Sequence, residues 1–163
     1  AVNTHLAGAA GTVTGAALTR LIGGKTDIVM MLNGALAGLV AITAEPLTPG
    51  PITAMVIGSI GAVIMYYGTK LLENLGLDDV VGAIPVHMFA GIFGTLVVPL
   101  TNADTSFGTQ FIGVISVCVF SFVLSWITFS TLKSTIGLRI SRAAEKQGTD
   151  KAEVGVVAYS IRD

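Results

Sequence analysis

Long apolar runs separated by short charged segments are the feature that most constrains this chain. Charged residues make up 12% of its 163 residues, and the mean hydropathy is +0.80, whereas a soluble domain carries about a quarter charged residues. About 20 helical residues cross a bilayer core, and lipid offers no partners for free backbone groups. We therefore expect an all-α polytopic membrane helix bundle with five transmembrane helices, at residues 1–21, 28–43, 51–69, 80–100 and 107–138.

The basic residues sort onto one side of this five-helix topology. Arg20 and Lys25 lie between the first two helices, Lys70 lies between the third and fourth, and the other six follow from Lys133 onward. Lys and Arg concentrate on the cytoplasmic side of membrane proteins. The sequence thus predicts a transmembrane part at residues 1–138 and a cytoplasmic tail at residues 139–163, in a plasma membrane (cell inner membrane).

Small residues recur at helical spacing within the apolar runs. Glycine pairs three or four residues apart indicate faces on which helix backbones approach closely, because lipid supplies no hydrophobic drive between helices. We expect a compact bundle that packs on these pairs: Gly11 and Gly15, Gly34 and Gly38, Gly58 and Gly61, and Gly91 and Gly94.

His87 is the main candidate functional residue. It lies inside the fourth apolar run, eight residues after Asp79, or about 12 Å along a helix. An ionisable side chain within a membrane usually faces the bundle interior or a cavity and marks a pathway. Its position alone leaves two interpretations open, either a neutral imidazole hydrogen-bonded to a neighbouring helix or a group that lines a path for a small polar solute.

Four further polar residues are candidates for supporting roles. Asp78 and Asp79 begin the fourth helix, where acids cap free amides and favour the helix dipole. Asn33 and Thr43 on the second helix are candidates for cross-helix hydrogen bonds and, as a minor alternative, for positions next to a pore. His5 at the start of the chain is expected to be solvated.

Motifs of soluble enzymes are absent from the sequence. It contains no HExxH, no phosphate-binding GxxxxGK[ST], no GxGxxG and no nucleophile elbow. Its two histidines lie on different predicted helices, and the single Cys118 excludes a thiolate metal site. We expect neither an enzyme nor a bound cofactor or metal.

Several segments taken together resemble the ammonium transporter family (Amt/Mep/Rh). The match extends over almost the whole chain, and its motifs follow one another in the family's order. They are Asn3-Thr4-His5 with small residues after it, the run from Asn33 to Thr43, Asp78-Asp79 followed by His87 and Gly91, and a tail with Gly137-Leu138-Arg139, Gly148, Asp150, Gly155 and Tyr159.

The resemblance implies a fold and roles for particular residues. Members have eleven helices in two inverted five-helix halves plus a last helix, and form homotrimers with one pore per subunit. On that basis this chain, which starts without Met, corresponds to helices seven to eleven. His87 would be the second of two pore histidines, with the first histidine and the aromatic gate outside this sequence, and Asp79 would support the pore helix. The tail residues Gly137, Leu138, Arg139, Gly148, Asp150 and Tyr159 would be regulatory, with a PII-type protein as a possible cytoplasmic partner.

Three functions remain open at this point. The first is an ammonium/ammonia channel or transporter subunit that conducts through a narrow apolar pore lined by a histidine. The second is an ammonium-sensing membrane domain fused to a signalling module. The third is a non-conducting structural membrane module in which His87 is simply buried.

Overall fold

Helices make up nearly all of the regular structure. The computed structural model describes residues 1–158 and contains no β-strand among them, as the all-α prediction requires. The elements are α1 (Val2–Gly23), α2 (Ile28–Thr43), α3 (Pro51–Asn74), the π-helical segment η1 (Ile84–Phe89), α4 (Ala90–Val97), the 3₁₀ turn η2 (Val98–Leu100), α5 (Phe107–Thr135), α6 (Arg142–Gln147) and the π-helical turn η3 (Asp150–Val154).

The chain forms two compact units, residues 1–116 and 117–158 of the described part, with the boundary inside α5. The first unit holds α1 to α4 and the second holds most of α5 with the tail. The division into transmembrane residues 1–138 and a cytoplasmic tail stays a prediction.

Local signals in the sequence set the ends of the first three helices. Gly24 adopts a left-handed conformation with φ 75° and ends α1. The Asp27 carboxylate accepts a hydrogen bond from the Met30 amide at 3.1 Å and so caps α2, and Pro51 opens α3. The prediction of 28–43 matches α2 at both ends. The α3 helix extends five residues beyond the predicted residue 69, and Lys70 forms an ion pair with Glu73 in its last turn at 3.0 Å.

The fourth helix starts later than predicted and is not uniform. Residues 80–82 form a turn, and the helical stretch at residues 84–100 passes from π-helix through α-helix to a 3₁₀ turn. Gly82 has φ 74°, which a right-handed helix cannot accommodate, so the prediction that a helix runs from residue 80 is wrong at its start. The fifth helix likewise ends at Thr135 rather than 138, because Gly137 has φ 81°.

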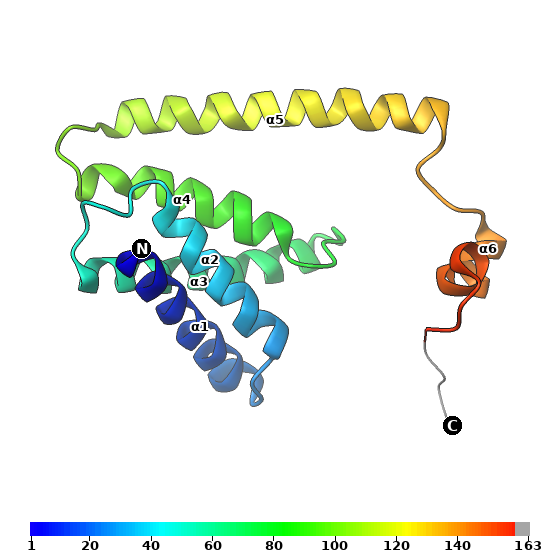
Figure 1. Cartoon of the computed structure of the whole chain (residues 1–163), viewed down its shortest axis with the longest axis horizontal. Coiled ribbons are helices and arrows are strands. Elements are labelled where there is room, and N and C mark those ends of the chain that lie inside the picture. The colour runs from blue at the N-terminus through cyan, green and yellow to red at the C-terminus, as the bar shows by residue number, and fades with distance from the viewer. Residues whose placement is uncertain (159–163) are drawn as a thin grey trace. The chain divides into compact units, whose positions relative to one another are not determined.

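Helices α1, α2, α3 and α4 pack together in the first unit (Figure 1), and glycines lie at their contacts. A methyl group on Gly11 would overlap the Gly34 carbonyl, and one on Gly15 would lie 2.8 Å from the Met30 carbonyl oxygen. The same holds for Gly58 against Ala7, Gly61 against Ala37, and Gly38 and Gly94 against the carbonyls of Ala7 and Ala41. The predicted glycine faces are therefore confirmed, except at Gly91, where a methyl group would make an ordinary contact of 3.5 Å with Val40.

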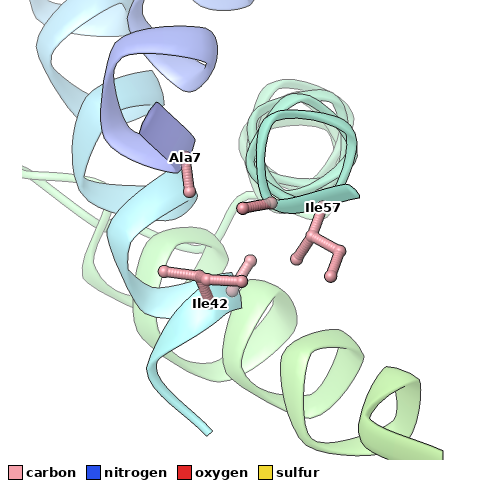
Figure 2. Close-up of a cluster of buried hydrophobic side chains, with 5 residues drawn as sticks. Ala7, Ile42 and Ile57 are labelled. Carbon is pink, nitrogen blue, oxygen red and sulfur yellow. The ribbon is translucent and has the colours of Figure 1, made fainter. Parts of the chain in front are cut away.

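Small apolar side chains fill the space between the helices. Ala7 from α1, Ile42 from α2 and Ile57 from α3 belong to one buried cluster, together with Ala41 and Ala54 (Figure 2). Alanine beside glycine leaves little side-chain volume at these crossings, so the backbones lie close enough for dispersion contacts to hold them.

The loops at each end of the α1–α4 bundle are those that the predicted five-helix topology places together. A cavity of about 320 Å³ is lined by Lys25 from the first connection and Lys70 from the end of α3. The other end joins different segments, since the Asn3 amide donates to the Pro49 carbonyl at 2.7 Å and the Asn102 amide donates to Glu45 at 3.2 Å. The predicted pairing of loops at the two ends is thus present in the bundle.

Within residues 1–158, two helices are long and apolar enough to cross a membrane by themselves. They are α3 with 24 residues and α5 with 29 residues, and no residue of α5 is buried within the described structure. Residues 28–43 and 84–100 form shorter apolar helices. The α1 helix spans 22 residues rich in alanine, glycine and threonine, or about 33 Å at 1.5 Å per residue.

A matched pair of glycine substitutions tests the packing. Alanine in place of Gly11 forces α1 away from the Gly34 carbonyl, and we expect it to lower the stability of the detergent-solubilised complete protein by about 1–3 kcal/mol. Alanine in place of Gly91 has room, and its higher helix propensity makes it neutral or stabilising by up to about 1 kcal/mol. Thermal unfolding of the two variants measures the difference, and equal melting temperatures would contradict the packing described here.

Candidate functional site

His87 lies on a π-helical turn at the start of the fourth helix. In η1 the side chains of Pro85 and Val86 are buried, whereas His87 is exposed on an otherwise apolar stretch. Val86 packs in a cluster with Ala37 and Met65. The wider π-helical turn therefore anchors one side in the bundle and presents the imidazole on another, an arrangement often found at functional sites.

A glycine on α3 allows η1 to approach closely. A methyl group on Gly68 would lie 2.5 Å from the Phe89 ring and 3.0 Å from Pro85. Two of the six residues of η1 thus rest directly on the α3 backbone. This contact fixes the side of the turn that faces away from His87.

Asp79 caps the helix that carries His87, as predicted. Its two carboxylate oxygens accept hydrogen bonds from the amides of Ala83 and Ile84, at 2.9 and 2.8 Å. A carboxylate at this position satisfies amides that have no partner within the helix and complements the helix dipole. Asp78 is exposed beside it, and both capping bonds are made by Asp79.

Asn33 makes the cross-element hydrogen bond that the sequence led us to expect. Its side-chain amide on α2 donates to the Val81 carbonyl at 3.0 Å. Val81 lies in the turn between Asp79 and η1, so Asn33 and Asp79 both act on the start of the helix that carries His87.

Thr43 does not form the cross-helix bond expected of it. Its hydroxyl donates to the Leu39 carbonyl of its own helix at 2.6 Å, and the side chain is exposed. This bond within the helix is common for threonine in apolar helices. Thr43 also lies ten residues from Asn33, or about 15 Å along α2, so the structure does not bring the two candidates together.

Polar contacts at the opposite end of the bundle were missed at the sequence level. Glu45 accepts from the Asn102 amide at 3.2 Å and from the Leu47 amide at 3.0 Å, which ties the loop after α2 to the loop after η2. The signal available was a lone acid in an apolar context, without any indication of its partner 57 residues away. His5 is exposed, as predicted, and its Nδ1 lies 2.8 Å from the Ala1 carbonyl oxygen.

The predicted regulatory tail forms local turns around Asp150. The carboxylate Oδ2 of Asp150 accepts a hydrogen bond from the Ala158 amide at 2.9 Å. The backbone carbonyl of Asp150 accepts one from the Val156 amide at 3.1 Å. The Ala158 amide, together with that of Lys151, lowers the pKa of the Asp150 carboxyl. Gly148 has φ 94° and a methyl group there would lie 2.6 Å from Asp150 Oδ1.

The other predicted tail residues lie outside this turn. Gly137 ends the last long helix, Leu138 is exposed, and the Arg139 guanidinium lies 3.8 Å from the Glu145 carboxylate. Tyr159 lies outside the described residues. In residues 1–158, no three His, Cys, Asp or Glu side chains come together in a way that could hold a metal ion.

Glycine-packed apolar helices with an ionisable side chain on one of them define the class of protein. It is an all-α membrane helix bundle. Comparison with known proteins then identifies the family.

The sequence matches the Ammonium Transporter Family over residues 1–159. It is 42% identical to the ammonium transporter Amt2 of Archaeoglobus fulgidus over 98% of this chain, and 35% identical to a putative ammonium transporter of Synechocystis over 95% of it. The chain spans 38% and 36% of the length of these two relatives.

Solved structures agree with the sequence relatives. A protein described as a sensor Amt protein superposes with a TM-score of 0.85 at 31% identity, over 93% of this chain and 40% of its own. Candida albicans Mep2 superposes with a TM-score of 0.80 at 27% identity, over 94% of this chain and 39% of its own.

The chain therefore belongs to the ammonium transporter family, whose members are integral membrane transporters. The family resemblance and the fold class predicted from the sequence are confirmed, and the chain is part of the family's fold. Its relatives are named as transporters rather than enzymes, in agreement with the prediction that it is not an enzyme.

The two neighbouring aspartates allow a paired test of the helix cap. Alanine in place of Asp79 leaves the amides of Ala83 and Ile84 without a side-chain acceptor, and we expect a loss of about 1–2 kcal/mol in stability. Alanine in place of Asp78 removes an exposed carboxylate and should change the stability by less than about 0.5 kcal/mol. Unfolding of the complete protein in detergent measures both, and a larger effect at Asp78 would contradict the assignment.

Proposed function

We propose that this chain forms one wall of an ammonium/ammonia-conducting pore, and that His87 lines the pore. The observation that carries the proposal is the exposed imidazole on η1, whose neighbours Pro85 and Val86 are buried on the bundle side. The chain spans about two fifths of the length of its relatives. A partner segment of the complete protein facing His87 would enclose the path.

An apolar path selects the form of the substrate that crosses it. Taking an ion such as ammonium out of water into an apolar medium costs several kcal/mol or more. A narrow apolar pore therefore favours ammonia, the deprotonated form. A neutral imidazole both donates and accepts hydrogen bonds, so His87 offers ammonia a partner where water is excluded.

Orientation and assembly are part of the same proposal. The Lys25 and Lys70 end of the bundle faces the cytoplasm, and so does the tail, in a multi-pass protein of the plasma membrane (the cell inner membrane) that serves nitrogen uptake. The exposed apolar surface contacts lipid, the other part of the fold, and neighbouring subunits of a homotrimer. A cytoplasmic PII-type protein is a candidate partner of the tail.

A sensing role is the second candidate. The observation that favours it is the superposition on a sensor Amt protein with a TM-score of 0.85. Sensing and conduction can use the same membrane fold, and they differ in whether binding at the His87 site leads to net flux. The non-conducting structural module is the third candidate, in which the rest of the complete protein packs directly on His87.

Substitution of His87 tests the proposal. In the complete protein, alanine at this position removes the imidazole from the path. We expect ammonium uptake into proteoliposomes to fall by about five- to tenfold or to lose its selectivity over potassium, since one hydrogen bond contributes about 1–1.5 kcal/mol. The assembled oligomer should be retained. The matched control is His5→Ala, because the Nδ1 of that imidazole lies 2.8 Å from the carbonyl oxygen of Ala1, the residue just before α1.

Two results would count against this function. Uptake and selectivity that are unchanged in His87→Ala would remove the pore assignment. Saturable ammonium binding without any flux in the unmodified complete protein would favour the sensor.

A deletion tests the regulatory tail. Removing residues 148–163 takes away Asp150 and the turn it stabilises with Ala158. We expect an assembled protein with uptake lowered by about tenfold, since a regulatory coupling of 1–3 kcal/mol changes an equilibrium 5- to 150-fold. Lys151→Ala is the control within the same segment, and full activity after the deletion would show that the tail carries no signal.

A further inference from the structure

We propose that Asn33 is a positioning residue for His87, acting through the turn at Val81 and Gly82. The inference rests on the proposed conducting role of His87. It goes beyond that role because it assigns the placement of the imidazole to an amide on a different helix, 54 residues earlier in the chain.

The contact between Asn33 and the turn is direct and specific. The Asn33 Nδ2 donates to the Val81 carbonyl at 3.0 Å. The same nitrogen would lie only 2.7 Å from a methyl group on Gly82. The Asn33 amide therefore lies against two consecutive residues of the turn, and the second is a glycine with a positive φ.

The turn at Val81 and Gly82 also determines where η1 begins. Gly82 is buried and has φ 74°, a conformation that favours glycine. Its carbonyl accepts a hydrogen bond from the Val86 amide at 3.2 Å, so the turn supplies the first acceptor of the helical segment. His87 is the next residue, and a shift of Gly82 is passed to it through this bond.

A π-helical turn depends on such external support. This geometry is rare and occurs mostly as single turns, so it must be held by contacts at its borders. Pro85 and Phe89 rest on Gly68 of α3, and Asp79 caps the amides of Ala83 and Ile84. Asn33 supplies a further contact from α2, so η1 and its His87 are positioned by α2 as well as by α3.

A merely structural role for Asn33 predicts something different. An amide that only stabilises the bundle would, when replaced, lower assembly or uptake to the same extent whether or not His87 is present. A positioning role predicts that the effect of Asn33 on uptake disappears once the imidazole is gone. Coupling between two residues of this kind is measured by a double-mutant cycle.

The experiment uses the complete protein in proteoliposomes and two substitutions of Asn33. Asn33→Asp keeps the size of the side chain but removes the donor to the Val81 carbonyl, and Asn33→Ala removes the whole amide without adding charge. Each is made alone and together with His87→Ala. Thr43→Val is the matched control on the same helix, because its hydroxyl bonds only to its own helix.

We expect Asn33→Asp and Asn33→Ala to lower the maximal uptake rate of ammonium at least fivefold in the presence of His87. In the His87→Ala background each should change the rate by less than twofold, with the oligomer assembled throughout and Thr43→Val unchanged. Equal losses in both backgrounds, failure of both Asn33 variants to assemble, or no loss in either would overturn the inference.

The failure of the proposed function has a separate signature. If His87→Ala by itself leaves uptake and selectivity unchanged, the pore role of His87 is lost, and the positioning role falls with it. If His87→Ala impairs uptake while the Asn33 variants behave like the unmodified protein, only the inference about Asn33 is overturned.

Discussion

The close approach of α2 to its neighbours through glycine is the interaction on which the rest of the structure depends. Lipid is as apolar as the helix surfaces, so helices associate only where their backbones come near enough for dispersion contacts. Gly34 lies against Gly11 of α1, and Gly94 of α4 lies against Ala41 of α2. The α2 helix thus contacts both the first helix and the helix that follows the histidine, and it forms the frame on which the candidate site is built.

The candidate site follows from this frame. Asn33 lies one residue before the glycine that packs on α1, so the contact that fixes α2 also fixes the amide that reaches Val81. From there the Gly82 turn and the Asp79 cap lead directly into the π-helical segment. Bundle packing consequently holds η1 through the buried side chains of Pro85 and Val86, while the imidazole of His87 is exposed.

Much of this could be predicted from the sequence, because the signals are local. The apolar run located α2 at both ends, and glycine spacing predicted the helix contacts that the structure confirms. The start of the fourth helix could not be predicted, because hydropathy does not report the sign of φ at Gly82. The bond from Asn33 to Val81 joins residues 48 apart, and Thr43 shows that a similar polar residue on the same helix can instead bond within it. The role of His87 in conduction remains a prediction.

The central claim is that the exposed face of His87 borders an internal path of the complete protein. An electron cryomicroscopy structure of the complete protein in lipid nanodiscs tests it most directly. We predict that the imidazole lies in a narrow apolar passage, opposite side chains contributed by the rest of the chain and away from lipid. An imidazole that faces lipid, or that is packed against another helix without a passage beside it, would contradict the account.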